Sequence, residues 1–216
     1  MTAGKPATRR LWPTVLVLTA LSILSACSAS RPVKYYVLDV DPLPATPGSP
    51  FPVTLIVGRI MTNELYRADR LVYGWGPVEL GTFEYERWAQ SPADMVQDIL
   101  IASLRETHQY RSVSRISSSL RGINADYIVR GRLLGLYEVD KPSMVARFSV
   151  ELELFQPKTG MTLWSGSYSH DEPVEGKTVP AVVEALDKNV HAGMQQLTES
   201  LGQYFSSHSP QEPQTR

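Results

Sequence analysis

VARFSVELELF, residues 145–155, carries the clearest strand pattern in the sequence. Apolar side chains occupy every second position, and polar side chains fill the positions between them. Successive side chains of a β-strand point to opposite faces, so the pattern predicts a strand with one packed face and one face in water. The packed face holds Ala146, Phe148, Val150, Leu152 and Leu154, and the wet face holds Arg147, Ser149, Glu151 and Glu153.

Other strands are expected on both sides of this one. The segments 126–140 and 161–169 are predicted to pair with it, and the turn PKTG at 157–160 supplies a glycine for the second hairpin. The segments 33–40 and 53–60 are apolar at both alternating sets of positions, which predicts strands covered on both sides. Residues 70–76 and 77–89 flank a Gly-Trp-Gly-Pro break and predict a looser, more exposed hairpin.

Two segments carry helical patterns. Ser91 is a natural N-cap before Pro92, and an apolar stripe follows, which predicts a helix over 92–107. A longer stripe with spacings of three and four residues predicts a second helix: Val183, Leu186, Val190, Met194, Leu197, Leu201 and Phe205. The order of strands, helix, strands, helix favours an α+β fold, a mainly antiparallel sheet with two helices packed on it.

The amino terminus has the layout of a secretory signal. Basic residues precede an apolar run from Leu11 to Leu24, which is shorter than the roughly 18–20 residues of a membrane-spanning helix. The run ends in Leu-Ser-Ala-Cys, which resembles the lipobox of bacterial lipoproteins. That resemblance implies cleavage after residue 26 and acylation of Cys27, with Ser28 similar to the outer-membrane class. An unmodified cysteine after a cleavage site is the alternative; a catalytic thiol lacks a histidine at meaningful spacing.

Removal of residues 1–26 leaves a mature chain that is long enough for one domain, expected over 27–206. It carries 18 Lys and Arg against 22 Asp and Glu, a balance that does not favour nucleic acid. Five prolines within 41–52 predict a stiff, extended connector, and the polar segment 207–216 predicts a disordered tail.

The sequence offers no candidate catalytic residues, metal ligands or cofactor loops. The four histidines lack metal-site spacing, and no nucleophile elbow or phosphate-binding glycine loop occurs. His170, Asp171 and Glu172 are interpreted as a solvated turn, and Glu151 and Glu153 as part of a water-facing strand. The serines between 112 and 119 indicate a polar loop or an edge strand. We therefore expect a protein that is not an enzyme.

Aromatic residues and arginines gather around the predicted 70–89 hairpin. Interfaces favour Tyr, Trp and Arg because each combines a large contact area with a polar group. The alternative is that Tyr85 and Trp88 pack under the first helix while the arginines are solvated. The residues are Tyr66, Arg67, Arg70, Tyr73, Trp75, Tyr85, Arg87 and Trp88.

Several motifs, in order, resemble the ABC-type transport auxiliary lipoproteins, the PqiC-like partners of MCE-domain lipid transporters. After the lipobox come YYVLD, VGRI, LYRADRLVYG, YERWAQSPADMV, ADYIVRGRLLGLY and GMTLWSGSY. The resemblance implies a fold similar to the amino-terminal domain of TolB and a lipid anchor at the periplasmic face of the outer membrane.

The same resemblance implies a non-enzymatic role beside an MCE protein and its inner-membrane permease and ATPase, which move lipids or hydrophobic solutes. It makes Tyr66, Arg67, Arg70, Arg87 and Trp88 the expected docking residues. An anchored periplasmic hydrolase, or a structural lipoprotein that binds peptidoglycan or another envelope protein, remain alternatives. Exposed strand edges and the final helix permit self-association without requiring it.

Overall fold

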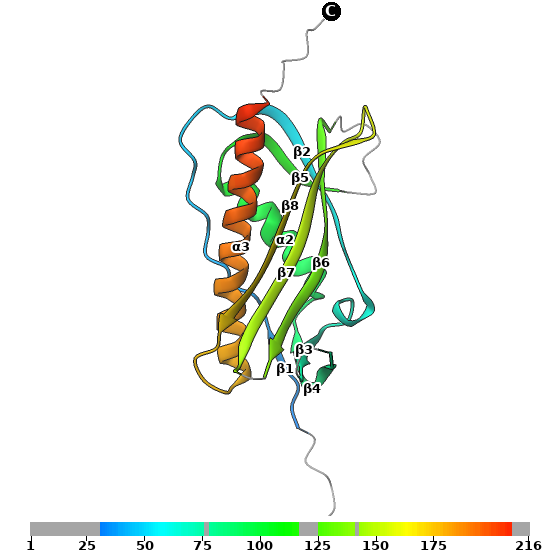
Figure 1. Ribbon diagram of the computed structural model, residues 1–216, viewed down its shortest axis with the longest axis vertical. Helices are drawn as coiled ribbons and strands as arrows, with labels where there is room; N and C mark the ends of the chain where they lie inside the picture. The colour runs from blue at the N-terminus through cyan, green and yellow to red at the C-terminus, as the bar shows by residue number, and fades with distance from the viewer. Residues whose placement is uncertain (1–30, 76–77, 117–124, 141–142, 209–216) are drawn as a thin grey trace, which may run out of the picture. The chain divides into compact units, whose positions relative to one another are not determined.

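An α+β domain of eight strands, one 3-10 turn and two helices makes up the computed structural model, which describes residues 31–75, 78–116, 125–140 and 143–208 (Figure 1). The strands are β1 (Lys34–Tyr36), β2 (Phe51–Thr62), β3 (Arg70–Gly74), β4 (Leu80–Trp88), β5 (Tyr110–Arg115), β6 (Tyr127–Val139), β7 (Val145–Gln156) and β8 (Met161–Pro173). The helical elements are η1 (Glu64–Tyr66), α2 (Pro92–Glu106) and α3 (Val179–Ser207). Within these residues no helix is long and apolar enough to cross a membrane.

All eight strands belong to one mixed sheet. The prediction that β7 pairs with the segments before and after it is confirmed, because β6, β7 and β8 form an antiparallel meander with long ladders. The β3–β4 hairpin is also antiparallel. The pairs β1–β4, β2–β5, β2–β6 and β3–β6 are parallel, which the sequence pattern did not predict.

Both helices pack on one face of the sheet, α3 over β7 and β8 and α2 over β2 and β5. The inward-facing apolar residues of β7 are buried as predicted, and so is the whole apolar stripe of α3. Since a single helical layer covers one face only, the other face of β6, β7 and β8 carries the polar side chains that the alternation places there. This uncovered face is one surface on which a partner protein could dock.

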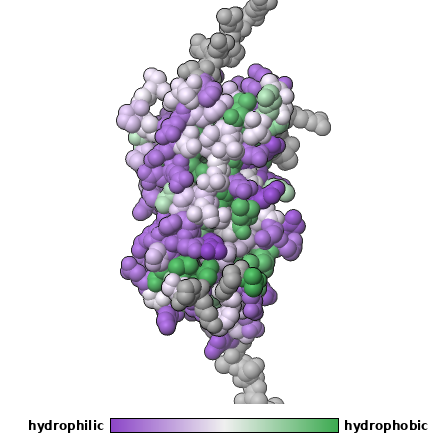
Figure 2. Space-filling view, viewed as in Figure 1, coloured by the Kyte–Doolittle hydropathy of each residue, from purple (hydrophilic) through white to green (hydrophobic). Residues whose placement is uncertain are grey.

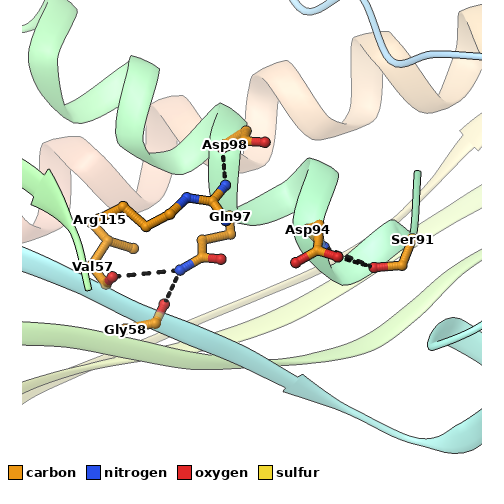
Figure 3. Close-up of polar contacts among 7 residues, drawn as sticks. All are labelled: Val57, Gly58, Ser91, Asp94, Gln97, Asp98 and Arg115. Atoms are coloured by element: carbon orange, nitrogen blue, oxygen red, sulfur yellow. Dashed lines mark hydrogen bonds and ion pairs between the residues drawn. The ribbon is translucent and has the colours of Figure 1, made fainter. Parts of the chain in front are cut away.

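The start of α2 and its contact with the sheet depend on polar side chains (Figure 3). Ser91 caps the helix, and its Oγ accepts a hydrogen bond from the backbone N–H of Asp94 at 3.3 Å. The side chain of Gln97 is buried and donates to the carbonyls of Val57 at 3.4 Å and Gly58 at 2.7 Å. These carbonyls lie where the pairing of β2 with β6 shifts register, so Gln97 satisfies backbone groups at that irregularity.

The first strand differs from its prediction. Residues 33–40 were expected to form a strand covered on both sides, but β1 has three residues and lies at the edge of the sheet. The chain then crosses the domain as the proline-bearing connector, which suits the predicted extended form. It follows α3, where the N–H of Asp39 donates to Asp187 Oδ1 at 3.1 Å and His191 Nδ1 lies 3.1 Å from the carbonyl oxygen of Asp41.

Several expectations fall outside the described residues. The signal segment and Cys27 precede residue 31, and most of the predicted tail lies in residues 209–216. The expected boundary before residue 207 falls in the last turn of α3, which ends at Ser207. Within the serine-bearing segment 112–119, residues 112–115 belong to β5, an edge strand, as one of the two alternatives held.

Candidate functional site

The structure separates the five expected docking residues into two groups. The side chains of Tyr66 and Trp88 are each 1% exposed and belong to the hydrophobic core. The packing alternative named Trp88, and its side chain does lie in the core; Tyr66, which that alternative did not name, is buried as well, and a side chain in the core cannot touch a partner. Arg67 and Arg70 are exposed, and Arg87 is half-buried.

Trp88 lies in the core cluster, on a strand that has neighbours on both sides. β4 lies between β1 and β3, and Tyr36 of β1 is opposite Trp88 in the register. The backbone N–H of Trp88 donates to the carbonyl of Asp69 at 2.6 Å, which ties the end of β4 to the residue before β3. The indole therefore anchors the base of the hairpin from inside.

The three arginines lie around this hairpin base. Arg70 and Arg87 are opposite each other in the β3–β4 register, so their side chains leave the same face. A guanidinium nitrogen of Arg87 donates to Asp69 Oδ1 at 2.8 Å, and one of Arg67 donates to Glu64 Oε2 at 3.1 Å. The ion pair of Arg67 with Glu64 is exposed and contributes little to stability, so Arg67 can leave Glu64 and bind a carboxylate of a partner protein.

A tighter ionic cluster lies on the uncovered face of the meander. Arg147 of β7 makes a bidentate contact with Asp171 of β8, with Nε and one terminal nitrogen each 2.6 Å from a carboxylate oxygen. Its other terminal nitrogen donates to the hydroxyl of Tyr137 on β6 at 3.1 Å. The hydrogen bonds from Arg147 hold the pKa of Asp171 below its ordinary value. The three strands thus present one fixed arginine–carboxylate–phenol group.

This cluster lines an open depression of about 490 Å³. Leu134, Ser149 and His170 complete much of the wall. The Arg147 guanidinium also lies 5.7 Å from the centre of the Tyr137 ring. Because the charges are already paired, the depression suits shape and hydrogen-bond recognition of a protein surface better than capture of a free anion.

A second depression, of about 450 Å³, lies further along the same strands. Arg130 donates through Nε to Glu153 Oε2 at 2.9 Å, and its guanidinium lies 4.5 Å from the centre of the Phe155 ring. Arg132 is opposite Glu151 in the register. The two glutamates expected on a water-facing strand therefore do face outward, each opposite an arginine.

The described residues hold no group of histidine, cysteine and carboxylate side chains that could bind a metal ion. His170, Asp171 and Glu172 were expected in a solvated turn, and this was wrong, since all three lie within β8. His170 Nε2 is 3.6 Å from Glu172 Oε2, while Asp171 is held by Arg147. Neighbouring residues of one strand point to opposite faces, so the three side chains do not converge on one site.

The Arg147–Asp171–Tyr137 cluster was missed from the sequence. Its members are 24 and 10 residues apart, and no local motif joins them. The 157–160 turn places β7 and β8 side by side, but an even hairpin register would put Arg147 opposite His170, so the turn alone does not reveal the cluster.

Comparison with known proteins identifies the family. The family model described as ABC-type transport auxiliary lipoprotein component matches residues 36–199, from the last residue of β1 to the final third of α3. No curated protein matches the chain.

Two crystal structures share the fold. One is a Xanthomonas campestris protein of family DUF330, with 17% identity, a TM-score of 0.74 and coverage of 82% of this chain and 99% of that chain. The other is an uncharacterized protein with 12% identity, a TM-score of 0.62 and coverage of 79% of this chain and 99% of that chain. At these identities the likeness shows the fold alone, while the family match spans most of the domain. The chain belongs to the ABC-type transport auxiliary lipoprotein component family.

Proposed function

We propose that this chain is a non-enzymatic auxiliary component of an ABC transporter of the MCE type, anchored by lipid at Cys27 to the periplasmic face of the outer membrane. Its partners are an MCE-domain periplasmic protein and the inner-membrane permease and ATPase. The transported molecules are lipids or hydrophobic solutes that move between the two membranes.

The observation that carries this proposal is the family match over residues 36–199. It includes nearly the whole folded domain, so the auxiliary role belongs to the domain and not to a short motif. The lipobox resemblance of residues 24–27 supports the anchor, because it places the cysteine directly after a signal-like segment.

The surface of the domain supports a docking role. The two depressions on the uncovered face of the meander are open and bordered mainly by charged or hydroxyl-bearing side chains. Sites that hold apolar ligands are concave and mostly apolar. We therefore assign this domain to contact with other proteins of the transporter, while enclosure of the lipid falls to those proteins.

We place the docking surface at the hairpin base, with Arg67, Arg70 and Arg87 as contacts. Tyr66 and Trp88 act from within the core by holding η1 and the end of β4 in place. Arginine suits this role because its planar group makes bidentate hydrogen bonds with carboxylates. The matching surface on the MCE protein is expected to be acidic.

Site-specific photocrosslinking in living cells tests the proposal. A photoreactive amino acid replaces Arg70 in one strain and Arg111 in another. Arg111 is the matched control because it is also an exposed arginine, on the edge strand at the opposite side of the sheet from β1. Position 70 is expected to form adducts with the MCE protein, and position 111 is not.

The adducts also separate this function from the alternative. Mass spectrometry that finds peptidoglycan fragments or an unrelated envelope protein at position 70 supports a structural lipoprotein. Equal adducts at both positions contradict the hairpin base as the docking surface. Charge reversal by Arg70→Glu is expected to weaken co-purification of the MCE protein and to leave the thermal midpoint unchanged, since this side chain is exposed.

A further inference from the structure

Exposed apolar side chains concentrate at one end of the domain. Ten large apolar residues are exposed in the described parts of the chain, and six of them belong to the β1 segment or the β3–β4 hairpin. Three form the hairpin tip: Trp75 is 52% exposed, Val78 is 91% exposed and Leu80 is 41% exposed. Figure 2 shows hydrophobic patches on this view at the level where Figure 1 places β3 and β4.

Backbone pairing holds the described residues on both sides of positions 76–77. Gly74 is opposite Leu80 in the antiparallel register, and the N–H of Trp75 donates to the carbonyl of Glu79 at 2.9 Å. The apolar side chains are therefore held at the end of a hairpin by backbone bonds. A single exposed valine or leucine is ordinary, but three exposed apolar residues within six positions indicate a surface that another apolar phase covers.

The direction of β1 relates this tip to the amino terminus. β1 is parallel to β4, with Lys34 opposite Glu86. The chain before Lys34 therefore leaves the sheet toward the start of β4, which is the side of the tip, and Figure 1 shows β1, β3 and β4 together at one end. The path from Glu86 back to Leu80 is six residues, and the path from Lys34 back to Cys27 is seven.

The length of this segment limits the distance between Cys27 and Lys34. At most about 3.6 Å per residue, seven residues span no more than about 25 Å, and the six residues of β4 span about 20 Å. A sulfur at Cys27 therefore lies within about 25 Å of Lys34, a reach comparable with the length of β4 from Glu86 to Leu80.

The side chains suit the boundary between lipid headgroups and acyl chains. Tryptophan and tyrosine favour that boundary, and Trp75 lies at the tip while Tyr35, 64% exposed, lies on the β1 segment. Glu79 and Glu84 are also exposed on the hairpin. Because a carboxylate strongly disfavours the hydrocarbon interior, they limit the tip to a shallow depth.

We propose that the β3–β4 hairpin tip is a second membrane contact, in which Trp75, Val78 and Leu80 insert into the headgroup boundary of a phospholipid bilayer. This inference rests on the proposed lipid anchor at Cys27. Two contacts fix the orientation of the domain, since acyl chains alone leave it free to rotate about its linker. The fixed orientation holds the hairpin base, with Arg70 and Arg87, above the membrane surface and accessible to the transporter.

Fluorescence quenching by brominated lipids tests the contact. The full chain is expressed with its signal, purified from membranes and reconstituted in vesicles of phosphatidylethanolamine and phosphatidylglycerol. An environment-sensitive fluorophore is attached to Val78→Cys or to Met161→Cys. Met161 is the matched control, because it is a 60% exposed apolar residue at the β7–β8 turn, toward the other end of the sheet.

The label at position 78 is expected to show a blue shift and to lose emission with lipids brominated near the headgroup. The label at position 161 is expected to show neither change. Absence of quenching at position 78, or equal quenching at both positions, overturns the inference. A blue shift at position 78 that appears only when the transporter proteins are present also overturns the inference, because it indicates that a protein covers the tip. Intact mass measured on the same sample shows whether Cys27 is acylated, so failure of the anchor is distinguished from failure of the tip contact.

Discussion

Asn189 offers a sharp test of how α3 is fixed to the sheet. Its side chain is fully buried, and its Nδ2 donates to the carbonyls of Ala146 at 2.8 Å and His170 at 2.9 Å. Its Oδ1 accepts a hydrogen bond from the hydroxyl of Tyr168 at 2.9 Å. One amide thus joins the helix to β7 and β8, and replacement by alanine removes all three bonds.

The magnitude follows from these contacts. A net contribution of about 1 kcal/mol per hydrogen bond gives about 3 kcal/mol, and the groups left without partners raise the loss to about 3–4 kcal/mol. A domain of this size loses about 2–4 °C of thermal midpoint per kcal/mol, so Asn189→Ala is expected to lower the midpoint by about 6–15 °C. Tyr168→Phe removes one bond and leaves Oδ1 buried without its donor, at a cost of about 1–2 kcal/mol.

Urea unfolding followed by circular dichroism measures these losses on the mature chain with Cys27→Ser. A double-mutant cycle of the two substitutions is expected to show a coupling of about 1 kcal/mol. Lys188→Ala is the control, because it changes the neighbouring exposed residue of the same helix. A loss below about 1 kcal/mol for Asn189→Ala, or additive effects in the cycle, would refute the interpretation that this amide locks α3 to the meander.

Three further predictions concern stability. Burial raises the pKa of Asp187 to about 6, so the folded state binds this proton more tightly than the unfolded chain does. The free energy of unfolding therefore falls as pH rises from about 4 to 6. In urea titrations Asp187→Asn is expected to raise the free energy of unfolding by about 1–2 kcal/mol at pH 7 and to leave it unchanged at pH 4, since partial solvation reduces the full effect. The pKa of Asp171 is lowered by hydrogen bonds from Arg147, so stability from this pair is present above about pH 4 and is lost as pH falls further. Asp171→Asn should destabilise the domain at pH 7, and its difference from the parent protein should shrink as pH falls below about 4. A difference that stays constant with pH would contradict the pairing. A chain cut before Val183 loses the seven large apolar side chains of the α3 stripe at about 1.5–3 kcal/mol each, which is comparable with or exceeds the roughly 5–15 kcal/mol that stabilises a domain. Its thermal scan should show no cooperative transition, and unchanged melting would mean that the stripe serves a partner.

Local periodicity predicted the elements that have one clear packed face. The stripe of α3 and the alternation of β7 depend only on spacing along the chain, so both could be found without knowledge of the neighbours. The N-cap at Ser91 is equally local, since its Oγ bonds to a residue three positions away. These features explain why the α+β class and the β6–β7–β8 meander followed from the sequence.

The parts that failed depend on contacts between distant segments. The parallel pairing of β1 with β4 leaves no local pattern, so the short edge strand was predicted as a longer, covered one. The burial of Trp88 depends on core residues that are distant in the sequence, which composition does not reveal.

The ionic cluster shows how one residue changes a site. In the ladder between β7 and β8, the pair nearest the turn is Gln156 and Met161. If the pairing continued without a shift, Arg147 would lie opposite His170. A register shift after Phe155 moves Arg147 opposite Asp171. An irregularity of this kind reverses which face each partner occupies, and no sequence signal marked it.

The central claim is that the domain works from a lipid anchor at residue 27. Mass spectrometry of the amino-terminal peptide, taken from protein in isolated outer membranes of the native cell, tests it most directly. The account predicts a peptide that begins at Cys27 and carries a diacylglyceryl group on sulfur. A peptide with an unmodified Cys27, or a mature chain that begins at another residue, would contradict it.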